Sequence, residues 1–157
     1  MKRFFVDARL PVLRAALVAV VGLVLCATAS FAESGAVEKV TPAPYLFELI
    51  KKNAFRKSLT KILRGNHPPD WINVFMRTSA GVAAPGEVLR MGGGNYTRSR
   101  LCKPHDCHAN QFAVMFTQDG TRAWAISYVS ATSSMQSFGS PDAEMTAVLL
   151  EAIDREK

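Results

Sequence analysis

The stretch FAVMFTQDGTRAWAISYV, residues 112–129, decides the fold. Phe112 to Thr117 is a strongly apolar run, which is typical of a buried strand. Asp119-Gly120 is a signal for a type I′ hairpin turn, and Thr121 to Val129 continues as the partner strand. Side chains alternate along a strand, so this partner strand has two opposite faces. One face carries Trp124, Ile126 and Tyr128, and the other carries Ala123, Ala125 and Val129. The stretch therefore predicts an antiparallel hairpin.

Three further strands are expected upstream of the hairpin. Trp71 to Met76 is rich in large and β-branched apolar residues, and Val88 to Met91 is a short apolar run. Tyr96 to Leu101 alternates like a strand with one solvent-facing side, and a glycine-rich turn at 92–95 precedes it. Residues 81–86, between two of the expected strands, and residues 131–139, after the last one, are expected to be loops.

Helical patterns flank these strands. Over residues 45–63 the apolar residues fall mostly three or four apart, which predicts a helix that starts near Pro44 and stops at Gly65. Ser140 is expected to cap a last helix, whose apolar residues over 145–153 line one face. This order predicts the α+β class: a single domain with a mostly antiparallel sheet of about five strands flanked by helices.

The first 32 residues have the features of a secretory signal peptide. Residues 1–14 carry four basic residues against one acid, and an uncharged apolar run follows. The run ends in Ser30-Phe31-Ala32, with small residues at the −3 and −1 positions of a cleavage site before Glu33. We therefore expect export, with residues 33–44 as a flexible lead-in and residues 45–157 as the domain.

A retained membrane anchor and a lipid anchor are the competing interpretations of this segment. Its strongly apolar part is shorter than the roughly 20 residues that a membrane span needs. Cys26 follows Leu25, whereas a lipidation site needs a small residue before its cysteine. We therefore expect no membrane attachment after cleavage.

Composition and charge narrow the class of protein. The chain of 157 residues is 48% hydrophobic, which excludes a disordered protein. Residues 33–157 keep 15 basic and 12 acidic residues, a net charge of +3. Six of these cations recur over 51–64, where a solvated helix face is the simplest explanation. This small excess and the expected export do not favour nucleic acid as a partner.

Cys102 and Cys107 remain after cleavage, and an even pair of cysteines in an exported protein favours a disulfide. The pair brackets four residues: Lys103, Pro104, His105 and Asp106. Closing this ring lowers the entropy of the loop, so His105 is presented at a smaller entropy cost on binding. Asp106 is expected to bond to nearby backbone or to favour the protonated imidazole.

Other chemistries remain open for this segment. Cys102, His105, Cys107 and His108 are all zinc-ligand types, although their crowded spacing matches no familiar zinc finger. A redox pair is disfavoured because C-x-x-C spacing and a thioredoxin-like βαβ order are absent. A stapled turn without a function is the third interpretation.

No other segment carries a recognisable catalytic motif. The triple glycine at 92–94 lacks the Lys-Ser or Lys-Thr pair of a phosphate loop, and no G-x-S-x-G is present. His67 lies in a Pro-rich loop and is interpreted as solvated. Trp71 and Trp124 are expected in the core.

The run CKPHDC at 102–107 resembles the signature loop of the Ivy family, which are inhibitors of vertebrate lysozyme exported by Gram-negative bacteria. The segment 63–72 resembles the family's helix–Pro–Trp entry to the sheet, and 113–116 resembles its next strand. The similarity covers roughly residues 54–153, which is most of the chain after the expected signal peptide.

This resemblance implies an antiparallel sheet with flanking helices and a disulfide between Cys102 and Cys107. It implies a periplasmic protein with no catalytic activity, cofactor or metal of its own. Its loop, Cys102 to Cys107, would enter the cleft of c-type lysozyme and place His105 against the two catalytic carboxylates. Asp106 would hold the loop or meet a polar group in the cleft. Lysozyme needs both carboxylates to flank the scissile bond, so an imidazole between them would block it.

Alternatives to c-type lysozyme as the partner, and to inhibition as the function, follow from the charge and the residues of the chain. Vertebrate lysozymes are strongly basic, and a chain with a net charge of +3 is not complementary to them as a whole. A lytic transglycosylase, which also cuts peptidoglycan, is a second candidate target, and the family suggests a homodimer. The alternative function is a periplasmic metal- or ligand-binding module that uses the Cys/His loop.

Overall fold

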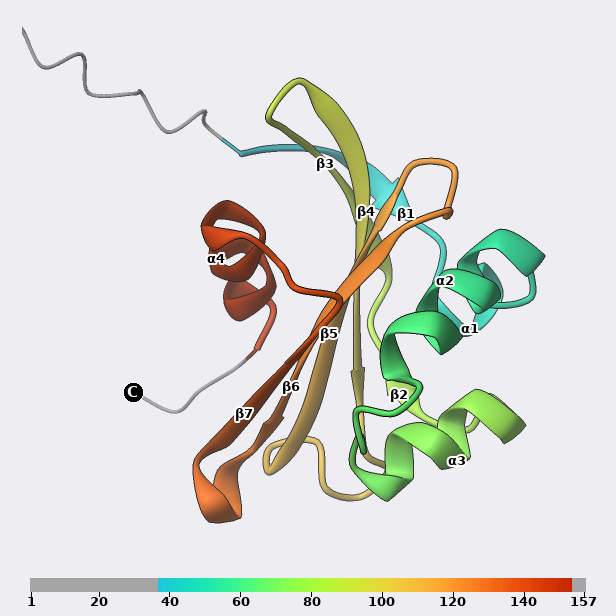
Figure 1. Ribbon diagram of the computed structural model, residues 1–157, viewed down its shortest axis with the longest axis vertical. Helices are drawn as coiled ribbons and strands as arrows, with labels where there is room; N and C mark the ends of the chain where they lie inside the picture. Colours follow the sequence, from blue (N-terminus) through green and yellow to red (C-terminus); the bar gives the residue numbers. More distant parts are fainter. Residues whose placement is uncertain (1–36, 154–157) are drawn as a thin grey trace, which may run out of the picture. The chain divides into compact units, whose positions relative to one another are not determined.

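The computed structural model describes residues 37–153, and the expected signal peptide over 1–32 lies outside them. The described part is one α+β domain built on an antiparallel sheet, as the sequence predicts (Figure 1). The sheet has seven strands in this part of the chain, in the order β1-β3-β4-β5-β6-β7, with β2 paired to β4. The strands are β1 Glu38–Ala43, β2 Val82–Ala83, β3 Gly86–Met91, β4 Gly94–Cys102, β5 Asn110–Thr117, β6 Ala123–Val129 and β7 Ser134–Phe138.

Helices cover both faces of this sheet (Figure 1). One face carries three helices and the other carries the last helix. Their bounds are α1 Leu46–Leu49, α2 Asn53–Leu63, α3 Asp70–Thr78 and α4 Ala143–Glu151, and a 3-10 helix, η1, spans Ser130–Thr132.

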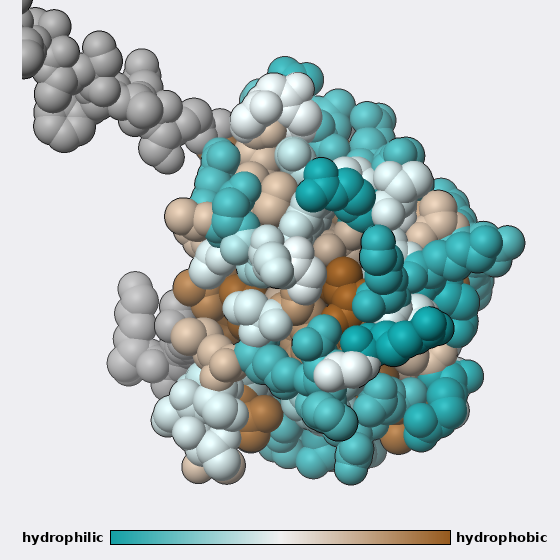
Figure 2. Space-filling model, viewed as in Figure 1, coloured by the Kyte–Doolittle hydropathy of each residue, from teal (hydrophilic) through white to brown (hydrophobic). Residues whose placement is uncertain are grey.

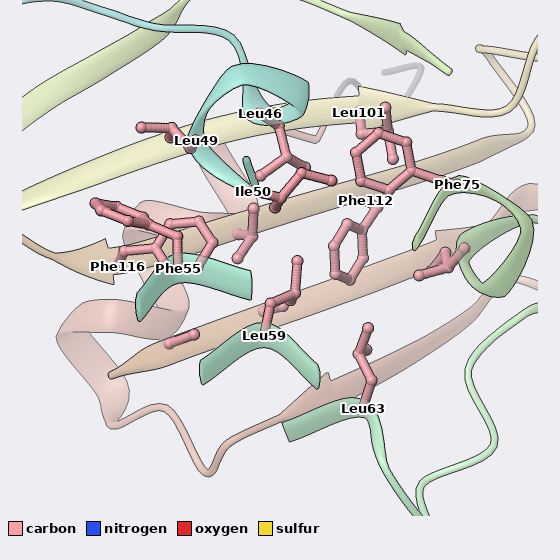
Figure 3. Packing of buried hydrophobic residues seen from close by; sticks show 14 of the residues in the cluster. Leu46, Leu49, Ile50, Phe55, Leu59, Leu63, Phe75, Leu101, Phe112 and Phe116 are labelled. Carbon is pink, nitrogen blue, oxygen red and sulfur yellow. The ribbon is translucent and has the colours of Figure 1, made fainter. Parts of the chain in front are cut away.

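The predicted hairpin is the centre of the sheet, and its alternation divides the core in two. Phe112, Val114 and Phe116 of β5 pack under α1, α2 and α3. Figure 3 shows Phe55 beside Phe116, and the centroids of the two rings are 5.1 Å apart. Ala113 and Met115 face the other way, and α4 covers them. In β6, Trp124 and Ile126 lie on the α4 face while Ala123 and Ala125 lie on the opposite face, as predicted.

The segment Trp71 to Met76 is a helix, α3, and its prediction as a strand is wrong. Ile72 and Phe75 are fully buried, whereas Val74 is 41% exposed. This spacing of three residues between buried side chains is helical, although five of the six residues are apolar. Packing of Ile72 and Phe75 on the sheet overrides the β propensity of the run.

Four other predicted segments differ from the structure. The expected loop at 81–86 contains β2, which pairs with β4. Residues 38–43 form β1, which pairs with β3, so this part of the expected lead-in belongs to the sheet. The expected loop at 131–139 contains β7, which pairs with β6. The helix expected over 45–63 is broken into α1 and α2 at residues 50–52. A short edge strand such as β7 is hard to recognise from the spacing of its apolar residues, because most of its side chains are exposed.

The β5–β6 turn and the cap of the last helix also differ from their predictions. A type I′ turn needs positive φ at both central residues; Gly92 and Gly93 between β3 and β4 meet this condition. In the β5–β6 turn only Gly120 has positive φ, and its N–H donates to the Thr117 carbonyl at 2.8 Å. The last helix is capped by Asp142, whose carboxylate accepts from a backbone N–H at 2.8 Å, and not by Ser140.

An ion network joins α4 to the sheet. The Arg98 guanidinium of β4 binds the carboxylates of Glu87 and Glu151 and donates to the Val148 carbonyl at 2.7 Å. Burial raises the pKa of the Glu87 carboxyl, but Lys39 and Arg98 beside it lower it more, so its pKa lies below the usual value. Across the described residues, no helix is long and apolar enough to span a membrane.

Candidate functional site

The CKPHDC loop connects β4 to β5, two neighbouring strands in the middle of the sheet. β4 ends at Cys102, and the disulfide from Cys102 to Cys107 closes the loop as predicted, with the two Cα atoms 4.7 Å apart. At the base, the Lys103 N–H donates to the Asn110 carbonyl at 3.1 Å, and the Asn110 N–H donates to the Asp106 carbonyl at 3.0 Å. The loop is therefore fixed to a rigid strand pair.

Within the ring, Lys103 to Asp106 form a tight turn. The Asp106 N–H donates to the Lys103 carbonyl at 3.1 Å, so Pro104 and His105 are the two central residues. His105 has φ +63°, and positive φ at the third residue of a turn with proline at the second is the pattern of a type II turn. Pro104 and His105 are both exposed. The turn therefore holds the histidine at the tip of the loop.

The His105 imidazole makes no hydrogen bond or ion pair with another part of the described chain. The Asp106 carboxylate instead accepts from Lys103 Nζ at 3.1 Å and from Asn110 Nδ2 at 2.7 Å. The carboxylate thus holds the loop through two side chains and not through the expected bond to backbone. His105 is thus left with both ring nitrogens open to a partner.

Asn110 completes the loop, and the sequence reasoning missed it. Its backbone closes the base and its side chain reaches the Asp106 carboxylate, so one residue fixes the loop twice. No pattern of residue types predicts this contact, because the position of Asn110 depends on where β5 begins.

The surroundings of the loop are shallow. A pocket of about 230 Å³ beside the disulfide is lined by Val82, Ala83, Arg100 and Gln111. The Gln111 side chain donates to the His108 carbonyl at 3.3 Å. Because both sulfurs are joined, Cys102 and Cys107 offer no thiolate to a metal. Across residues 37–153, no group of three or more His, Cys, Asp or Glu side chains is placed to hold a metal ion.

The other singled-out residues belong to other segments of the chain. His67 is exposed between α2 and α3 and has φ +46°, which makes it similar to His105 in backbone and exposure. Trp124 is buried in the core, as expected. Trp71 is only partly buried, and its indole N–H has no hydrogen-bond partner in the described part of the chain.

Fold and loop together define a small α+β domain that presents one disulfide-closed turn with an exposed histidine at its tip. Residues 54–154 match the family model described as Inhibitor of vertebrate lysozyme (Ivy), and the chain belongs to this family.

Three relatives illustrate the range of similarity. An uncharacterized protein of Yersinia pestis is 27% identical over 148 residues, which cover 81% of this chain and 94% of that protein. An Inhibitor of vertebrate lysozyme from Pseudomonas aeruginosa is 29% identical over 84 residues, covering 53% of this chain and 52% of that protein. An Inhibitor of vertebrate lysozyme from Escherichia coli K12 is 26% identical over 70 residues, covering 45% and 41%. This chain therefore matches about half the length of the relatives that carry this name.

Proposed function

We propose that this protein is an inhibitor of c-type lysozyme that acts through the loop from Cys102 to Cys107. The observation that carries the proposal is the exposed His105 at the tip of a turn that is closed by a disulfide. Membership of the Ivy family and the names of the inhibitor relatives support the same conclusion.

In the proposed complex, the loop enters the active-site cleft and His105 sits between the two catalytic carboxylates. Lysozyme needs one carboxylic acid and one carboxylate on either side of the scissile bond. An imidazole with two open ring nitrogens is able to bond both groups and takes the place of the sugar. The inhibitor itself performs no chemistry.

The loop suits this role because it is ordered before it binds. The disulfide, the turn bond from Asp106 to Lys103 and the bond from Asn110 to Asp106 already fix its shape. A preformed loop loses little conformational entropy in the complex, so more of the contact energy appears as affinity.

The decisive experiment is an inhibition assay with His105→Ala and His67→Ala. Both positions are exposed histidines with positive φ, so backbone strain from alanine is common to the two variants. Charge-assisted hydrogen bonds to desolvated carboxylates contribute about 1.5–3 kcal/mol each. We expect His105→Ala to weaken inhibition roughly 30- to 1,000-fold and His67→Ala to leave it nearly unchanged. Equal inhibition by His105→Ala and wild type from pH 5 to 8 would refute the inserted-histidine mechanism.

The identity of the target is tested in the same assay. Wild-type protein is measured against a c-type lysozyme, a g-type lysozyme and a lytic transglycosylase. We expect the c-type enzyme to be inhibited most strongly. A preference for the transglycosylase would replace the proposed partner.

The proposed location is the periplasm, reached through the signal peptide over 1–32. The intact mass of the exported protein should correspond to a chain that starts at Glu33, without a lipid on Cys26. A membrane-bound product that keeps residues 1–32 would contradict this. Free-thiol counting and zinc analysis of the same sample test the alternative metal-binding module, which needs both thiols reduced.

A further inference from the structure

One helix collects cations without any acid. Residues 51–64 contain six basic residues and no acidic one. All six are exposed. We call them the cationic face of α2: Arg56, Lys57 and Lys61 lie in the helix, and Lys51, Lys52 and Arg64 flank it.

The face is continuous along the solvent side of the helix. Lys57, Lys61 and Arg64 follow one another at intervals of four and three residues, so they lie in one line. Phe55 and Leu59 point the opposite way into the core (Figure 3). Figure 2 shows hydrophilic side chains gathered over the side of the molecule formed by α2 and α3.

These charges are not neutralised within the described chain. None of the six cations forms an ion pair there; Arg56 donates instead to the carbonyls of Ile50 and Met76, at 3.2 and 3.0 Å. Lys52 lies over the Phe55 ring, 5.8 Å from its centroid. The cationic face therefore presents its full charge to solvent.

An ordinary solvated helix is built differently. Such helices alternate acids and bases four residues apart and place acids in the first turn. Here Lys57 and Lys61 are a like-charge pair at this spacing, and the first turn of α2 has no acid. The arrangement works against the stability of the helix, and a local departure of this kind indicates that the residues serve a function.

A shallow pocket adjoins the cationic face. It has a volume of about 410 Å³ and is lined by Lys61 and Arg122 together with Thr121 and Ser140. The two cations and the Ser140 hydroxyl can donate to phosphate oxygens. The Thr121 hydroxyl already donates to the Asp119 carboxylate at 2.9 Å. The pocket has room for one phosphate-bearing head group.

We propose that the cationic face of α2 binds the surface of an anionic phospholipid bilayer. α2 has 11 residues and is about 16 Å long, so its exposed face can contact several phosphates of an extended array rather than a single enclosed ligand. Clusters of lysine and arginine on an amphipathic helix are typical of binding to anionic lipid. This contact is peripheral and needs no membrane span, and it does not depend on the proposed lysozyme inhibition.

The position of α2 leaves the CKPHDC loop accessible. Phe55 packs directly on Gly120 in the β5–β6 turn, where a Cβ would lie 2.3 Å from its ring. That turn and the loop are at opposite ends of β5, whose eight residues extend about 25 Å. The start of α2 therefore lies near the end of β5 opposite to the loop.

The test compares two charge-matched double variants of the exported protein, purified from cells that express the full chain. Lys57→Gln/Lys61→Gln removes two charges from the cationic face. Lys39→Gln/Arg90→Gln removes two exposed charges from β1 and β3, at the far edge of the sheet. Co-sedimentation is measured with vesicles of phosphatidylglycerol and phosphatidylcholine, and with vesicles of phosphatidylcholine alone.

We expect wild type to bind the anionic vesicles only, and less tightly as salt is raised. The Lys57→Gln/Lys61→Gln variant should bind roughly 10- to 30-fold more weakly, while the Lys39→Gln/Arg90→Gln variant stays close to wild type. Circular dichroism and lysozyme inhibition in solution should be unchanged in both. No binding to phosphatidylglycerol, equal binding to phosphatidylcholine, equal loss in both variants, or tighter binding to dextran sulfate than to the vesicles overturns the proposal.

Discussion

Removing the side chain of Asn110 tests how much the loop gains from being held in one shape. Asn110→Ala deletes the bond from Nδ2 to the Asp106 carboxylate, which is 2.7 Å long. The backbone bonds of Asn110 to Lys103 and Asp106 stay, so the register of β4 and β5 is unchanged. The disulfide also stays. The substitution therefore loosens the turn without opening the ring.

The expected magnitude follows from the exposure of the pair. A hydrogen bond to a charged group contributes about 1.5–3 kcal/mol when it is shielded from water. The Asp106 side chain is 38% exposed and keeps Lys103 as a second partner, so solvent screening reduces the loss to about 1 kcal/mol. We expect inhibition of c-type lysozyme to weaken about fivefold.

The assay is a titration of lysozyme activity, with thermal unfolding of the same samples. Asn66→Ala is the matched control, because Asn66 Nδ2 also donates one bond, to the Ile62 carbonyl at 2.8 Å, but lies at the end of α2. Asn66→Ala should lower stability slightly and leave inhibition unchanged. If Asn110→Ala inhibits as well as wild type, or if both variants lose the same affinity, the loop does not depend on this bond.

Three further substitutions probe the ring, a turn and the ion network. Cys102→Ser/Cys107→Ser removes the ring closure, which contributes about 2 kcal/mol to stability. The free energy of binding to lysozyme should fall by more than the free energy of unfolding in urea, and inhibition equal to wild type would contradict preorganisation. Gly120→Ala places a Cβ 2.3 Å from the Phe55 ring at φ +73°, so it should destabilise by more than about 2 kcal/mol in urea unfolding. Glu87 has its pKa lowered below 4.5 on folding, so it stabilises above that pH and its contribution is lost as pH falls through the folded pKa. Glu87→Gln should therefore show a shallower loss of stability in acid than wild type, and parallel curves would count against the network.

The central hairpin was predictable because its pattern has one interpretation. A strongly apolar run, a turn signal and an alternating run specify two paired strands, and the structure pairs Phe112 with Ser127 and Phe116 with Ala123. The turn type was not predictable from Asp119-Gly120 alone. The Asp119 carboxylate accepts from the side chains of Thr117 and Thr121, and this favours a longer turn with positive φ at glycine only.

The failure at α3 has a physical cause that applies to short apolar runs in general. Six residues are too few to distinguish a period of 2 from a period of 3.6 when nearly all are apolar. Asp70 in the first turn of the helix, after Pro69, is the signal that would have decided for a helix. Edge strands β1 and β7 escaped detection for a different reason: most of their side chains are exposed, and they are recognised by their pairing with β3 and β6.

The candidate site was predictable as a set of residues but not as a geometry. Spacing predicted the ring from Cys102 to Cys107 and the presentation of His105, and the disulfide is present. The left-handed φ of His105 is set by the turn bond between Lys103 and Asp106, which no pattern of residue types specifies. The partner of the Asp106 carboxylate was likewise open, because it depends on where β5 begins.

Charge distribution bears on the apparent mismatch between this chain and a basic enzyme. Outside the cationic face of α2, residues 33–157 contain nine basic and twelve acidic residues, a net charge of −3. The positive excess of the whole domain therefore comes from one helix. Screening limits its reach to about 8–10 Å at physiological salt, and it begins at the opposite end of β5 from the loop. The rest of the surface carries the sign that favours approach to a cationic partner, so net charge alone does not describe how this loop meets its target.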